Sequence, residues 1–152
     1  MKNAVENAAR KNLLGMFRGY GLERELFERF PKNIEWHLCR FVSADLKNIR
    51  YIDYSYWNEL SAGTRSPLTA AQQIQSGTEI YGQSTDGFLR AAEFIKNGGK
   101  FARPVLLTSD FRNFVIVEGH LRITAYALVP AQFENVECFV GACARSELTK
   151  WM

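Results

Sequence analysis

Residues 114–128 read FVIVEGHLRITAYAL, and this stretch determines which kind of fold the chain can adopt. An apolar, β-branched run stops at Gly119, and an amphipathic run starts at the next residue. The pattern predicts a strand over 114–117 that enters a helix over about 119–128 through a very short turn. A helix begins with unpaired N–H groups and with the positive end of its dipole, so this junction favours a negative charge.

The first turn of the predicted helix carries His120 and Arg122. A cation at a helix start is unfavourable by some tenths of a kcal/mol up to ~1 kcal/mol, and a bound anion would reverse that sign. The Arg122 guanidinium is a planar fork of donors suited to phosphate, and His120 can donate one or two hydrogen bonds. Glu118 could orient Arg122, hold a metal ion or act as a base. The junction therefore predicts a site for a phosphate or a similar group.

A purely structural interpretation of the same residues stays open. Glu118 and Arg122 are four residues apart and could form a surface ion pair worth a few tenths of a kcal/mol. Glu118 also favours the helix dipole with no ligand present, and His120 could simply cap the turn.

The patterns outside this stretch predict an α+β chain, with helices first and a mixed sheet later. We expect helices over 3–18, 22–30, 67–75 and 86–97, and strands within 34–54 and over 104–108 and 134–140. Residues 55–66 are expected to form a loop or a short turn of helix, and residues 76–84 an irregular segment. Turn residues at 110–113 predict a hairpin between 104–108 and 114–117. Asp86 is the expected N-cap of its helix, with an apolar stripe formed by Phe88, Leu89, Ala92 and Ile95. We divide the chain into an N-terminal helical appendage (1–33) and a domain (34–152).

The composition bounds the class of protein. The 152 residues are 47% hydrophobic and 13% aromatic, which is enough for one domain with a real core. A formal charge of +3 does not by itself imply a nucleic-acid partner. The three cysteines are odd in number and show no C-x-x-C spacing, which argues against a disulfide framework or a zinc site and favours a reducing compartment. No signal peptide and no apolar run approaching ~20 residues is visible, so we expect a cytoplasmic protein without a membrane partner.

A longer block carries a family likeness. A helix over 86–97 is followed by Gly98-Gly99 and a strand that starts at Pro104, and the later strand ends in Gly119-His120-Leu121-Arg122 with Ala125 in the next helix. Over roughly residues 86–140 this resembles the core of the ParB/sulfiredoxin-like superfamily, whose members typically show a glycine, two variable residues and an arginine at a strand-to-helix junction. The resemblance implies a small mixed sheet with packed helices.

The resemblance also implies a nucleotide phosphate site, with Gly119, His120 and Arg122 on the phosphates and Glu118 before the glycine. Relatives bind ATP or CTP or phosphorylate serine, and Mg²⁺ could enter with the nucleotide. Sulfiredoxins place a catalytic cysteine directly after the glycine, where this chain has His120, so sulfinic-acid reduction is not expected. Partitioning relatives continue into a second nucleotide motif and a helix-turn-helix region, whereas this sequence ends soon after Val140, so a full DNA-sliding clamp is not expected either.

A second candidate stretch is WNELSAGTR at 57–65. Trp57 and Arg65 could stack on a base and clamp a phosphate, and Glu59 is an alternative acidic group. The same residues also fit an ordinary capped loop in which Trp57 fills the core.

Two functional hypotheses follow. The first is a nucleotide- or phosphate-ligand-binding domain. In its stronger form it is a phosphotransferase or nucleotide hydrolase, in which Glu118 or Glu59 activates or orients the reacting group. The second is a DNA-associated accessory protein of a plasmid, phage or mobile element. In that case nucleic acid would bind without catalysis to basic residues of the first two helices, namely Arg10, Lys11, Arg18, Arg24, Arg29 and Lys32.

Overall fold

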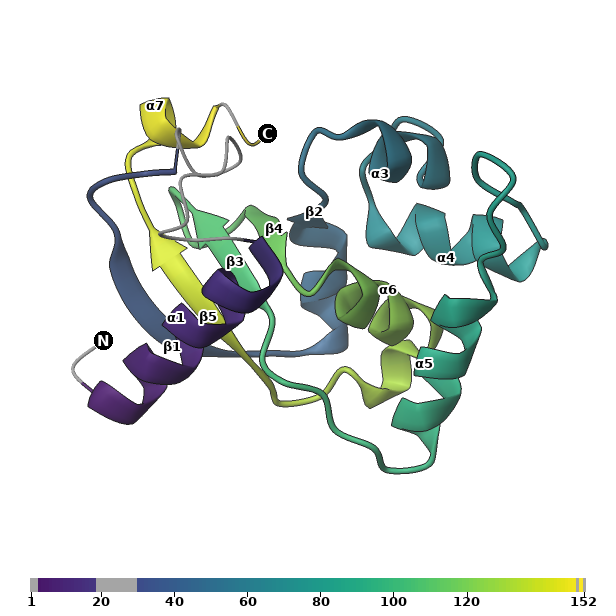
Figure 1. Ribbon diagram of the computed structural model, residues 1–152, viewed down its shortest axis with the longest axis horizontal. Coiled ribbons are helices and arrows are strands. Elements are labelled where there is room, and N and C mark those ends of the chain that lie inside the picture. Colours follow the sequence, from purple (N-terminus) through teal and green to yellow (C-terminus); the bar gives the residue numbers. More distant parts are fainter. Residues whose placement is uncertain (1–2, 19–29, 150, 152) are drawn as a thin grey trace.

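The computed structural model describes residues 3–18, 30–149 and 151. Within these ranges the chain is α+β, as predicted, and is built on a five-stranded mixed sheet with the order β1-β5-β3-β4-β2 (Figure 1). The strands are β1 (Glu35–Phe41), β2 (Ile49–Arg50), β3 (Val105–Thr108), β4 (Phe114–Glu118) and β5 (Val136–Ala142). The antiparallel hairpin of β3 and β4 is confirmed, and β5 pairs parallel to β3 and antiparallel to β1.

The helices agree with most of the predicted ranges. They are α1 (Ala4–Arg18), α3 (Ser55–Leu60), α4 (Pro67–Gln75), α5 (Asp86–Lys96), α6 (His120–Leu128) and α7 (Arg145–Leu148), with short 3₁₀ helices η1 (Ser43–Asn48) and η2 (Pro130–Gln132). The expected helix over 22–30 falls largely outside the described residues. The residues after β5 form α7, and Trp151 is buried.

Two details of α5 differ from the prediction. Thr85 is the N-cap and Asp86 is already the first helical residue, because the Ser84 hydroxyl accepts the Asp86 N–H at 3.1 Å. Leu89 is exposed, and Ala91 is buried in its place. The buried stripe therefore follows positions 88, 91, 92 and 95, which is the i, i+3, i+4, i+7 spacing of one helix face.

Both faces of the central strands are covered. One face packs against α4, α5 and α6, and its strand residues are Leu106, Ile116, Cys138 and Val140. The other face packs against Leu14 of α1 and the C-terminal residues Leu148 and Trp151, and its strand residues are Val105, Leu107, Val115, Val117 and Phe139. Because strands buried on both sides need apolar residues on both faces, β3 and β4 are apolar except for Thr108 and Glu118 at their ends.

The first helix is part of this core. Leu14 is fully buried against the sheet, and the Arg10 guanidinium lies 4.1 Å from the centre of the Trp36 ring. Arg10 is itself buried, so its expected place on a solvated basic face is wrong, while Lys11 and Lys32 are exposed. A boundary near residue 33 stays a prediction. In the described part of the chain, no helix has the length and apolar character needed to cross a membrane.

Candidate functional site

Gly119 makes the turn from β4 into α6. Its backbone adopts φ +95° and ψ 27°, a left-handed conformation that side chains other than glycine rarely adopt. A Cβ atom here would lie 3.1 Å from Pro104 Cβ and 3.2 Å from Arg122 Nε. Glycine is therefore required both by the turn and by the close approach of the segment that leads into β3.

A cavity of about 520 Å³ opens at this junction, within the size range typical of small-molecule sites. It is lined by Trp57, Phe101, Ala102, Glu118, Gly119, His120, Leu121 and Arg122. The structure thus brings Trp57 together with the residues of the 118–122 turn, a proximity that the sequence cannot show.

Glu118 and Arg122 form an ion pair, but it is buried rather than on the surface. Their side chains are 9% and 11% exposed, and Arg122 Nη2 donates to Glu118 Oε1. Arg122 Nη1 donates to the carbonyl oxygens of Ala102 at 2.8 Å and Arg103 at 3.3 Å. The guanidinium fork thus holds backbone carbonyls, which differs from the open phosphate-binding fork predicted from the sequence. The Glu118 carboxylate is likewise engaged rather than free to act as a base.

The open donors of the junction are backbone amides. The N–H groups of Leu121 and Arg122 make no hydrogen bond to any described residue, and the same holds for Arg122 Nε. The first backbone hydrogen bond of α6 runs from the Ile123 N–H to the Gly119 carbonyl at 2.9 Å. Because Gly119 has no side chain to cap the helix, two amides and the positive end of the dipole remain at the edge of the cavity.

His120 belongs to an aromatic stack. Its ring is 4.7 Å from that of Trp57 at 18°, and Trp57 is 4.8 Å from Tyr51 at 26°. Burial raises the pKa of Tyr51, so its hydroxyl stays protonated and donates to Thr124 Oγ1 at 2.6 Å. Thr124 in turn donates to the His120 carbonyl at 2.7 Å. At 3% exposure, His120 is a structural member of the wall and not the open phosphate donor that we expected.

Two other predicted residues do not line this cavity. Glu59 is exposed on α3. Arg65 contacts the segment after β2 through its backbone, because its carbonyl accepts the Tyr51 N–H at 2.8 Å. The structure instead adds Phe101 and Ala102 to the lining. Both lie between Gly98-Gly99 and Pro104, which belong to the block that carries the family likeness. Their position inside that block is the sequence signal that could have identified them.

The residues at this cavity can bind an anion next to the aromatic side chains of Trp57 and Phe101. Two backbone amides and one guanidinium N–H are open, and the nearest carboxylate is neutralised by its arginine. Among residues 3–18, 30–149 and 151, no three histidine, cysteine, aspartate or glutamate side chains gather as metal ligands would. Comparison of the chain with protein-family models, curated proteins and solved structures finds no match.

Proposed function

We propose that the cavity at the start of α6 binds a nucleotide, ATP or CTP, or another phosphorylated small molecule, as the resemblance to ParB/sulfiredoxin-like domains implies. The supporting observation is the pair of open amides at Leu121 and Arg122 on the edge of a cavity of about 520 Å³. Phosphate groups are favoured at helix N-termini because N–H groups and dipole act together.

The organic part of the ligand has an aromatic surface to pack on. Trp57 and Phe101 line the same cavity, and the half-buried Trp57 ring is held in place by the stack on His120 and Tyr51. A ring fixed in this way loses little conformational entropy when a base stacks on it. We therefore assign the phosphates to the amides and the base to the aromatic wall.

Arg122 has a positioning role in this proposal. Since its Nη1 group donates to the Ala102 and Arg103 carbonyls, Arg122 fixes the cavity wall, and its Nε is left for the ligand. The Glu118–Arg122 pair carries no net charge, so the attraction for phosphate comes from the helix start and from any Mg²⁺ that the nucleotide carries in the cytoplasm. The proposal is one of binding, because phosphoryl transfer would require a Glu118 carboxylate released from Arg122.

The DNA-binding alternative has no comparable support. Of the basic residues that it invoked, Arg10 is buried over Trp36, and Lys11 and Lys32 are the exposed ones among the described side chains.

The test is isothermal titration with ATP, CTP, GTP and UTP, with and without Mg²⁺. Leu121→Pro removes one open N–H at a position in the first helical turn, where proline is best tolerated, and Leu121→Ala is the matched control that keeps the N–H. We expect at least one nucleotide to bind the wild type, and Leu121→Pro to weaken it about tenfold while Leu121→Ala stays within about twofold. Absence of nucleotide binding by the wild type, or equal binding by a folded Leu121→Pro protein, would overturn the proposal.

A further inference from the structure

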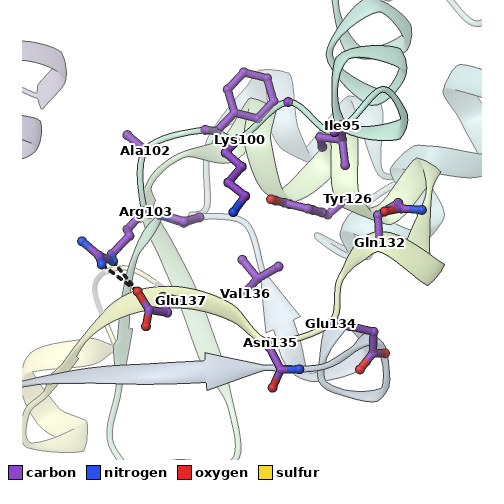
Figure 2. Close-up of a pocket in the computed structure, with 14 residues that line it drawn as sticks. Ile95, Lys100, Ala102, Arg103, Tyr126, Gln132, Glu134, Asn135, Val136 and Glu137 are labelled. Carbon is purple, nitrogen blue, oxygen red and sulfur yellow. Dashed lines mark hydrogen bonds and ion pairs between the residues drawn. The ribbon is translucent and has the colours of Figure 1, made fainter.

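A second cavity lies on the other side of residues 98–104 from the first. It measures about 640 Å³ and is bounded by the end of α5, residues 98–104, the last turns of α6 and the chain from η2 into β5 (Figure 2). Its polar lining residues are Lys100, Arg103, Tyr126, Gln132, Glu134, Asn135 and Glu137. It shares Phe101 and Ala102 with the cavity at the start of α6, but no residue of the 118–122 turn lines it.

Tyr126 is a buried donor with no partner. Its side chain is held in α6 among core residues and is only 9% exposed, yet its hydroxyl makes no hydrogen bond to any described residue. Figure 2 shows the hydroxyl pointing into the cavity. Burial raises the pKa of Tyr126, so the hydroxyl is protonated at neutral pH and able to donate. A polar group that is nearly buried normally finds a partner, and the cavity is the open side from which one can reach this hydroxyl.

Lys100 adds a positive charge without a counter-ion. Its side chain forms no ion pair with a described residue, and Figure 2 shows its ammonium group directed into the same space as the Tyr126 hydroxyl. The carboxylates nearby are already engaged. Glu137 accepts from Arg103 at 2.6 and 2.9 Å, which together with Arg40 lowers its pKa, and Glu134 accepts a backbone N–H at 3.2 Å.

The remaining wall is apolar. Ile95 comes from one side and Val136 from the other (Figure 2), and Phe101 is a further apolar lining residue. The Phe101 ring is held by Phe94, with the ring centres 4.9 Å apart. The cavity therefore combines an anion-seeking end with a hydrocarbon surface, which is the usual composition of a site for a small organic ligand.

We propose that this second cavity binds a small organic anion, a carboxylate or phosphate monoester with an apolar or aromatic body. The anionic head pairs with Lys100 and accepts the Tyr126 hydroxyl hydrogen, and the body packs on Phe101 and Val136. This inference does not rest on nucleotide binding, because it uses neither the open amides of α6 nor Trp57 and, of the residues that line the first cavity, it uses only Phe101.

The test is titration calorimetry of the full chain with benzoate and with phenyl phosphate, and with benzyl alcohol as the uncharged probe. Tyr126→Phe removes a single oxygen, and Lys100→Gln removes the charge from an exposed side chain, so both variants should fold. Lys96→Gln is the matched control, because Lys96 pairs with Glu93 and does not line the cavity. We expect one or both anions to bind the wild type and the Lys96 variant, and binding to weaken about tenfold in Lys100→Gln and severalfold in Tyr126→Phe.

Three results would overturn the proposal. These are no binding of either anion to the wild type, binding of benzyl alcohol as tightly as the anions, and unchanged anion binding in both cavity variants. A fourth comparison separates this site from the first cavity: Leu121→Pro should leave benzoate and phenyl phosphate binding unchanged. Loss of both probes in that variant would place them at the start of α6 and also refute the second site.

Discussion

Removing the Arg122 guanidinium should destabilise the protein strongly, because it would leave a buried carboxylate and two part-buried carbonyls without their donor. In Arg122→Met the Glu118 carboxylate, 9% exposed, loses its counter-ion, and the carbonyls of Ala102 and Arg103 lose their hydrogen bonds. Breaking a buried pair from one side costs about 3–5 kcal/mol. We expect the free energy of unfolding of Arg122→Met to fall by that amount.

The double variant Glu118→Leu/Arg122→Met separates the charge from the hydrogen bonds. With no carboxylate left to bury, the remaining loss is that of the carbonyl partners, about 1–3 kcal/mol. The double variant should therefore be more stable than Arg122→Met alone, although it carries one more substitution. Urea unfolding followed by far-UV circular dichroism measures all the variants on one scale.

Arg103→Met is the control, because the Arg103–Glu137 pair is also an arginine–carboxylate contact but is 39% and 29% exposed. A pair in contact with solvent is worth about 0–1 kcal/mol. If Arg122→Met costs no more than Arg103→Met, or if the double variant is no more stable than Arg122→Met, the argument for a buried pair that anchors the cavity wall is refuted.

Further substitutions and conditions test other parts of the structure. Gly119→Ala should lower the free energy of unfolding in urea by about 1 kcal/mol more than Gly77→Ala does. Both glycines have positive φ (+95° and +78°), but only at Gly119 would the added Cβ lie 3.1–3.2 Å from Pro104 and Arg122. Equal losses would contradict the close approach. Cys138 is fully buried, and burial raises its pKa. A thiol reagent at pH 8 should therefore modify the half-buried Cys39 and Cys143 first and Cys138 only on unfolding. Simultaneous reaction of all three thiols would be inconsistent with the packing. Hydrogen bonds from the turn amides, first that of Asn113, hold the pKa of Asp110 well below its usual range. The stability it contributes is complete above the unfolded-state pKa of about 3.9 and is lost as the pH falls through the lower folded-state value, so Asp110→Asn should flatten the acid side of a stability–pH curve, and an unchanged curve would argue against this turn.

Local patterns in the sequence predicted the elements around the site well. The apolar run over 114–117, the glycine and the amphipathic run after it correspond to β4, Gly119 and α6, because period and turn chemistry are local properties. The capping of α5 shows the limit of this reasoning: the sequence predicts Asp86 as the N-cap, whereas Thr85 takes that position and the Asp86 N–H donates to the Ser84 hydroxyl.

Contacts across the sheet could not be predicted in the same way. β5 lies between β1 and β3, although its sequence neighbours are the helices α6 and α7, since strand order depends on pairing between distant segments. The Arg122 side chain reaches carbonyls about twenty residues earlier in the chain, so spacing alone indicated a surface pair with Glu118. The stack of Trp57 on His120 joins α3 to α6 and likewise has no local signal.

The central claim is that the open amides at the start of α6 receive a phosphate group. The most direct measurement is a ¹⁵N-resolved NMR titration of the full chain with ATP and with CTP, following the backbone amide signals of Leu121 and Arg122. We predict that these two signals shift downfield on binding, together with the indole N–H of Trp57, while amides of 132–137 stay in place. Shifts confined to other parts of the chain, or none at saturating nucleotide, would contradict the account.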